Sequence, residues 1–212
     1  MPELLFNRGS NASIELDFVS VGHGLSVMRN EVTESEWGAC VADDGCHFQP
    51  TSKTARQGGP YPVTGVGVLD AQQFVLWAQN TIDPHVRLPT LEEWYTFSEL
   101  RPVRPKTVFT DPRLAWAATY GTDGAIDPRL RTSGGFGANS KGLEDIKGNV
   151  WEWTSTCAAN TSPQRCPAFY AAGEHETRVP IFVRDPSSGG CATGTPPAHL
   201  GIRLVRDNEG NN

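Results

Sequence analysis

Asp145 and Glu152 lie close together in the stretch KGLEDIKGNVWEWTS, which covers residues 141–155. In an extended or irregular segment, these carboxylates and the carbonyl groups between them can meet at one hard cation, because calcium takes about six to eight oxygen ligands and accepts main-chain carbonyls. Gly148 is expected to permit the backbone turn that such wrapping requires. The spacing is not that of an EF-hand, so the residues alone favour a tryptophan-rich core turn with a solvated Asp and Glu.

The five cysteines offer a second kind of chemistry. Cys40 and Cys46 close the short loop CVADDGC, and Cys157 and Cys166 bracket the polar loop AANTSPQR. Two loop-closing pairs predict disulfides and an oxidising, extracytoplasmic compartment, although a bond between Cys157 and Cys191 that leaves Cys166 free satisfies the same sequence. Zinc is disfavoured, because neither pair has the C-x2-C spacing and no His pair stands ready to complete a tetrahedron.

Short elements must position these residues. Residues 14–27 alternate loosely between apolar and polar types and predict one or two strands with a turn at 22–24. Thr33 followed by Glu36 forms a capping box, which predicts a helix that stops at 43–45.

The next elements follow the same logic. Asp70 is predicted to be the N-cap of a helix through AQQFVLWAQN, and Thr90 with Glu93 predicts a third, short helix. Later strands are expected around 179–183 and over 199–207. With 22 Gly and 16 Pro, the whole predicts an α+β, loop-rich protein.

Composition limits the class of protein. The 212 residues suit one domain over 1–212, and the net charge of -6 gives no electrostatic footprint for nucleic acid or an anionic membrane. No apolar run is long enough to span a bilayer. The start of the chain lacks a basic and then apolar signal pattern, so the expected extracytoplasmic location rests on the cysteine pairs alone.

Five blocks of sequence occur in an order that is typical of one family. Together they resemble the formylglycine-generating enzyme family, also called the sulfatase-modifying factor family, over about residues 31–207. The resemblance implies a C-type lectin-like fold with short helices beside a small, twisted, mostly antiparallel sheet. The blocks are EVTESEW (31–37), PVTGVGVLDAQQFVLWA (62–78), RLPTLEEW (87–94), NSKGLEDIKGNVWEWT (139–154) and GGC...LGIRLVRD (189–207).

The resemblance also implies a structural calcium ion. By position, its ligands are the side chains of Asp145 and Glu152 and the carbonyl groups of Gly148 and Val150. Asp145 replaces the family's usual Asn and remains an oxygen donor. Such an ion would hold a loop whose backbone lacks ladder partners.

Enzymes of this family oxidise a cysteine of a substrate protein, using copper held by two cysteines between the G-G and G-F-R blocks. Here that interval, CATGTPPAHL (191–200), contains Cys191 alone, and copper(I) favours a pair of soft thiolates. The resemblance therefore implies a non-catalytic recognition or maturation accessory module for another protein or ligand, with copper and catalytic residues not expected. The alternative is a divergent copper-dependent oxidase that uses Cys191.

The tryptophans divide between core and surface. Trp94, Trp151 and Trp153 lie in blocks where the family uses tryptophan for packing, so we expect them in the core. Trp116 and Tyr120 lie in the irregular stretch RLAWAATYG and are predicted to contact a ligand or partner. Loops on a rigid scaffold are where such binding normally resides.

Two arginines in the family blocks are expected to form internal bridges. Arg87 and Arg203 are more consistent with pairing to a carboxylate than with binding a ligand, because guanidinium and carboxylate groups match in geometry. Glu93 and Glu152 are the predicted acceptors.

Overall fold

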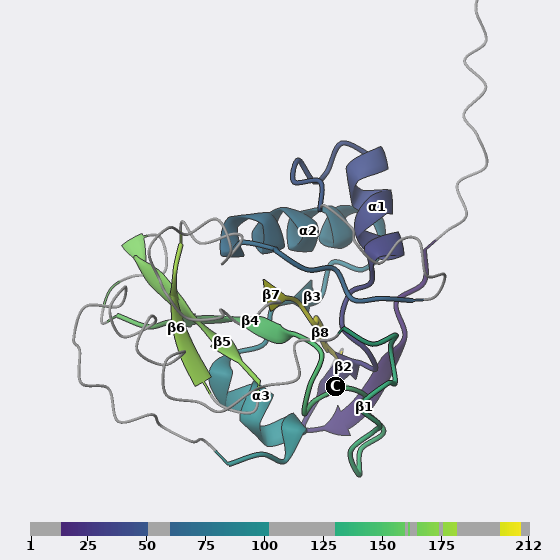
Figure 1. Ribbon diagram of the computed structural model, residues 1–212, viewed down its shortest axis with the longest axis vertical. Helices are drawn as coiled ribbons and strands as arrows, with labels where there is room; N and C mark the ends of the chain where they lie inside the picture. The colour runs from purple at the N-terminus through teal and green to yellow at the C-terminus, as the bar shows by residue number, and fades with distance from the viewer. Residues whose placement is uncertain are drawn as a thin grey trace, which may run out of the picture.

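The computed structural model describes residues 14–50, 60–101, 130–159, 161, 165–173, 176–181 and 200–208 (Figure 1). Within these ranges it contains three helices and eight strands, and the strands form two sheets of four. The predicted α+β class is confirmed, with two small sheets in place of the one that was expected.

The first sheet has the order β1-β2-β8-β3 and is antiparallel throughout. β1 and β2 form the hairpin predicted for 14–27, turning at residues 22–24, where all three backbones adopt positive φ. The strands are β1 (Phe18–Gly22), β2 (Leu25–Met28), β3 (Val86–Arg87) and β8 (Val205–Asp207).

The second sheet has the order β6-β5-β4-β7, in which β4 and β7 are parallel and the other pairs antiparallel. The single strand predicted over 199–207 is therefore wrong: this segment contributes β7 to one sheet and β8 to the other. Residues 202–204, between them, are fully buried. The strands are β4 (Trp151–Cys157), β5 (Ala168–Ala172), β6 (Glu176–Pro180) and β7 (Leu200–Gly201).

Two of the helices begin with the predicted capping boxes. At the start of α1 (Glu34–Ala42), the Thr33 hydroxyl accepts a hydrogen bond from the Glu36 backbone N–H, and the Glu36 carboxylate accepts one from the Thr33 N–H. The same exchange between Thr90 and Glu93 opens α3 (Leu91–Ser98).

The predicted start of the second helix is wrong. α2 (Val68–Thr81) has Gly67 as its N-cap, and Asp70 lies inside the first turn. The Asp70 carboxylate reaches back and accepts a hydrogen bond from the Gly67 N–H at 3.0 Å. A glycine N-cap has no side chain that marks it in the sequence. The prediction therefore chose Asp70, the acidic residue whose carboxylate completes the cap.

The core has two parts on opposite sides of the sheets (Figure 1). α1 and α2 cover one side, where the rings of Trp37 and Phe74 stack with centroids 5.3 Å apart. α3 covers the other. Trp94, Trp151 and Trp153 are buried, as predicted. No helix in the described ranges is long and apolar enough to cross a membrane.

Candidate functional site

Arg203 lies in the segment that links the two sheets, and its side chain is completely buried. Its Nε donates a hydrogen bond to Oε1 of Glu152, on β4, at 2.8 Å. The predicted bridge is therefore confirmed, and a charge-assisted bond joins the linking segment to the second sheet.

The remaining donors of Arg203 contact backbone carbonyl groups. Nη1 donates to the carbonyls of Met28, at 2.9 Å, and Arg29, while Nη2 donates to that of Glu144 at 2.8 Å. The end of β2 and the loop before β4 are thus attached to one planar group. Because a guanidinium presents its donors in a fixed fork, these contacts define the positions of three segments relative to each other.

Glu31 is a second buried acidic residue beside Arg203, and its side chain makes no hydrogen bond to the described part of the chain. Its carboxylate is fully buried, lies 3.8 Å from Nη2 of Arg203, and has no hydrogen-bond partner among the described residues. Burial raises the pKa of the Glu31 carboxyl well above its usual range, and the Arg203 charge offsets part of that rise. Sequence reasoning used Glu31 only as the first residue of a family block and missed its role as a buried acid.

Glu152 is held from two sides. Oε1 accepts from Arg203, and Oε2 accepts from the indole Nε1 of Trp94, on α3, at 2.6 Å. Trp94 is therefore more than core filling, because it orients the carboxylate that receives the buried arginine.

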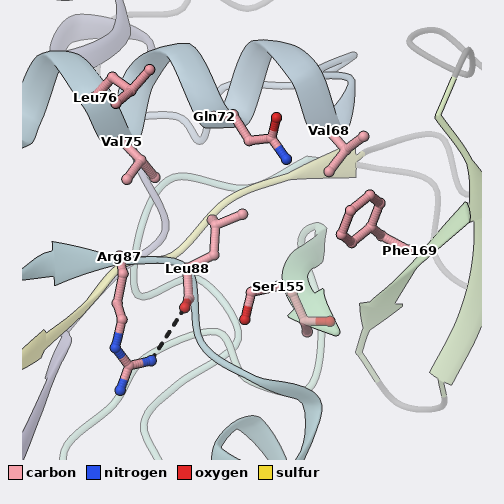
Figure 2. A pocket seen from close by; sticks show the side chains of 9 residues that line it. Val68, Gln72, Val75, Leu76, Arg87, Leu88, Ser155 and Phe169 are labelled. Atoms are coloured by element: carbon pink, nitrogen blue, oxygen red, sulfur yellow. Dashed lines mark hydrogen bonds between the residues drawn. The ribbon is translucent and has the colours of Figure 1, made fainter. Parts of the chain in front are cut away.

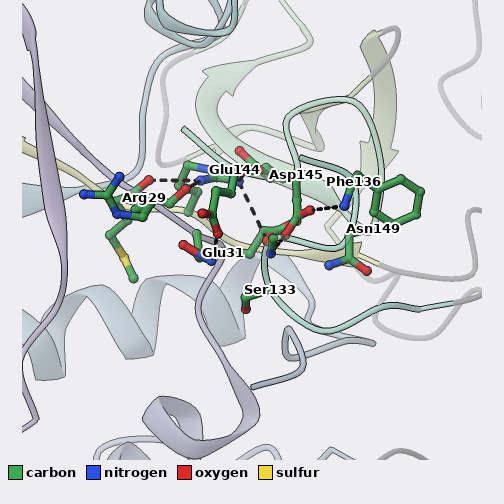
Figure 3. A network of polar contacts seen from close by, with 12 residues as sticks. Arg29, Glu31, Ser133, Phe136, Glu144, Asp145 and Asn149 are labelled. Atoms are coloured by element: carbon green, nitrogen blue, oxygen red, sulfur yellow. Dashed lines mark hydrogen bonds and ion pairs between the residues drawn. The ribbon is translucent and has the colours of Figure 1, made fainter. Parts of the chain in front are cut away.

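Asp145 is held by the backbone of a neighbouring loop (Figure 3). Its two oxygens accept hydrogen bonds from the N–H groups of Phe136, at 2.7 Å, and Gly134, at 2.6 Å. Asp145 itself adopts the left-handed conformation, with φ of 61°. The carboxylate thus replaces the ladder partners that this loop lacks.

The prediction that Gly148 makes the turn is wrong. The positive φ values in this stretch belong to Asp145 and to Asn149, at 70°. At Gly148 an added Cβ would lie 2.5 Å from the ring of Phe136. The glycine is therefore needed for the close approach of an aromatic ring.

The predicted calcium ligands have the oxygen atoms that this ion requires. In the structure, however, each carboxylate oxygen of Asp145 and Glu152 already accepts an N–H hydrogen bond, and the Gly148 carbonyl accepts one from Val150. An ion held by these groups would share Glu152 with Arg203. Calcium at these four ligands stays a prediction. If calcium binds there, it either competes with the Arg203 guanidinium for Glu152 or adds to its stabilising effect, and a stability measurement distinguishes the two.

Both predicted disulfides are present. Cys40 and Cys46 are bonded with Cα atoms 5.3 Å apart, and Cys157 and Cys166 with Cα atoms 5.7 Å apart. The alternative pairing of Cys157 with Cys191 is therefore wrong. Cys191, like Trp116 and Tyr120, lies outside the described residues, and so their predicted roles stay predictions.

A comparison with known families assigns the chain. The FGE-sulfatase family, described as the sulfatase-modifying factor enzyme 1-like domain, matches residues 16–208. The chain belongs to this family. The matched range begins earlier than the predicted range of 31–207, because it includes the hairpin of β1 and β2. No curated protein matched the chain.

Three solved structures are similar to the chain in fold. Treponema denticola variable protein 1 is 17% identical, covers 92% of this chain and 93% of its own, and has a TM-score of 0.52. CarF is 20% identical with coverage of 92% and 97% and a TM-score of 0.53. PvdO from Pseudomonas aeruginosa is 19% identical with coverage of 86% and 80% and a TM-score of 0.54. At these identities the likeness shows the fold alone.

Proposed function

We propose that this FGE-sulfatase domain is a non-catalytic recognition or maturation accessory module that acts on another protein or ligand outside the cytoplasm. The observation that carries the proposal is the cysteine inventory. Of five cysteines, four form the bonds Cys40–Cys46 and Cys157–Cys166, so Cys191 is the one that remains to offer a thiolate.

The chemistry of copper explains why this matters. The oxidase activity that the family resemblance implies needs two thiolates on copper(I), which prefers soft ligands. A single thiol at the first position of the interval 191–200 supplies half of that pair. The described residues retain the scaffold, with the capped helices, the Arg203 bridge and the β4 block all in place. Retention of a scaffold without the paired ligands supports a binding role carried by loops.

Thiol counting and copper binding test the proposal together. In denaturant, the wild-type protein is expected to show one reactive thiol per chain, and Cys191→Ser none. Neither protein is expected to retain copper(I) against a chelator, and neither should convert the thiol of a cysteine-containing peptide to an aldehyde. Copper retained by the wild type and lost in Cys191→Ser, together with peptide oxidation, would establish the divergent oxidase in place of the recognition module.

The structural calcium ion belongs to the same proposal. An ion held by Asp145, Gly148, Val150 and Glu152 would stabilise the loop before β4 and would take no part in chemistry. Trp116 and Tyr120 are proposed as contacts for the partner. Replacing both with alanine is expected to weaken partner capture while leaving the thermal unfolding midpoint unchanged, and a lowered midpoint would place the two rings in the core.

A further inference from the structure

A trough runs beneath α2, between that helix and the strands β3, β4 and β5 (Figure 2). Its volume is about 420 Å³, which is within the range of binding pockets. Apolar side chains form most of its lining: Val68 and Val75 from the helix, Leu88 rising toward the helix, and Phe169 standing at one end.

The outer surface of α2 extends this apolar lining to solvent. Leu69 and Leu76 are 53% and 58% exposed, and they are the exposed large hydrophobic side chains among the described residues. The other exposed positions of the helix, Gln72, Asn80 and Thr81, are uncharged. In a chain with a net charge of -6, this helix therefore presents a face without charge. Depletion of charge around exposed apolar side chains is the pattern of an interface core.

The polar groups of the trough indicate a neutral occupant. Arg87 lines one end, but its guanidinium is bonded to Glu93 and Asp207, and in Figure 2 it points away from α2. The Ser155 hydroxyl donates to the Pro89 carbonyl.

The amide of Gln72 differs from these groups. It points into the trough and makes no hydrogen bond to the described part of the chain, so it offers a donor and an acceptor together. A charged partner group would lose its hydration here without gaining an opposite charge, which is costly.

We call this surface the α2 trough, lined chiefly by Val68, Gln72, Val75, Leu76, Leu88 and Phe169. We propose that the α2 trough binds an uncharged, apolar segment of a partner protein. One apolar side chain of that segment would lie over Leu88, and one of its backbone amides would bond to Gln72. The lining from Val68 to Leu76 spans about 12 Å of helix, enough for a few residues of an extended segment. This inference rests on the proposed recognition function and names the kind of partner.

The test uses the whole protein labelled with ¹⁵N and the peptide acetyl-GFGLG-amide as a probe, with acetyl-GSGSG-amide and acetyl-GKGEG-amide as controls. The apolar peptide is expected to shift the amide signals of Gln72, Leu76, Ser155 and Phe169, and the control peptides are not. Gln72→Glu and Leu76→Lys should each weaken binding about fivefold or more, because each places an unpaired charge in the contact. Asn80→Lys, one turn further along the same exposed helix face, is the matched control and should bind as the wild type does.

Other outcomes overturn the proposal. Peptide shifts that are absent, or that are equal in Gln72→Glu and the wild type, would show that the trough does not bind such a segment. Trough signals that move with protein concentration and stop doing so in Leu76→Lys would identify a second copy as the occupant. Binding of the neutral dye N-phenyl-1-naphthylamine without peptide binding would identify a small-molecule pocket. None of these results depends on copper or on Cys191, so the proposed function can fail separately.

Discussion

Arg203 and Arg87 both bridge carboxylates at nearly the same distance, yet their surroundings are opposite. Arg203 is 0% exposed and meets Glu152 at 2.8 Å, whereas Arg87 is 32% exposed and meets Glu93 and Asp207 at 2.7 Å. The buried group contacts the end of β2 and the loop before β4 through backbone carbonyls, and it contacts β4 through the Glu152 carboxylate. The more exposed group links the start of α3 to the end of β8. The difference teaches that bond geometry alone does not set energetic weight, because burial decides how much a lost partner costs.

Removing the buried arginine should have the largest effect. Arg203→Met leaves the Glu152 and Glu31 carboxylates buried without their cation, and we expect the free energy of unfolding to fall by about 3–5 kcal/mol. Arg203→Lys keeps the charge and loses the fork, so its loss should be smaller. Urea denaturation of the wild type, the two Arg203 variants and Arg87→Ala measures the free energy of unfolding of each. If Arg203→Met loses less than Arg87→Ala, burial does not set the energetic weight of these bridges.

Calcium binding tests whether a second cation, besides the Arg203 guanidinium, stabilises the buried carboxylates. If the predicted ion binds, calcium at 100 times its dissociation constant should raise the free energy of unfolding by about 2.7 kcal/mol. Asp145→Ala should abolish this gain, and Asp145→Asn, which keeps an oxygen donor, should retain part of it. Elemental mass spectrometry with unfolding in calcium and in chelator gives the result. Equal stability in both conditions would leave Arg203 as the cation of this cluster.

Glu31→Gln should change the pH dependence of stability, and this change sharpens the comparison between the buried and the more exposed arginine. Because the folded pKa of Glu31 is raised above its ordinary value of 4.5, its favourable contribution is present below that value and is lost as pH rises through the folded pKa. As pH rises above the ordinary value, the wild type should lose stability relative to Glu31→Gln, because the folded protein must then ionise a buried carboxyl. The exposed Glu15→Gln is the control, and parallel pH profiles for all three proteins would contradict the expectation.

Arg87→Ala should have the smallest effect, about 1 kcal/mol or less, and high salt should shrink it further. The Arg87 guanidinium holds the pKa of Glu93 and of Asp207 below their ordinary values of 4.5 and 3.8. Their contribution is therefore present above those values and is lost as pH falls. Acid titration of unfolding should show this loss in the wild type but not in Arg87→Ala, whereas a salt-independent loss of several kcal/mol would place Arg87 with the buried class.

Local signals predicted much of this structure. Thr33 with Glu36 and Thr90 with Glu93 gave two helix starts correctly, because a capping box is completed within four residues. Both disulfides were also predicted, because the paired cysteines close short loops. Both arginine bridges were predicted because the family blocks contain the arginines and the candidate carboxylates. The family itself was identified from its ordered blocks, and the comparison confirms it.

Features that depend on distant segments were missed. The sequence over 199–207 was predicted to be one strand and does not say to which sheet each half belongs, so the change of sheet could not be seen. Glu31 has no local mark of burial, and its environment comes from Arg203, far along the chain. The α2 trough depends in the same way on Val68, Leu88 and Phe169, which meet only in the folded protein.

The segment that carries β7 and β8 has a consequence for biosynthesis. Leu200 and Gly201 pair with β4, while Val205 to Asp207 pair with both β2 and β3, so neither sheet is complete until these residues have left the ribosome. The hairpin of β1 and β2 and the helices are translated long before. Both sheets therefore keep an unpaired strand edge until residues 200–207 have been made, and folding of the two sheets depends on contacts between segments that lie far apart in the sequence.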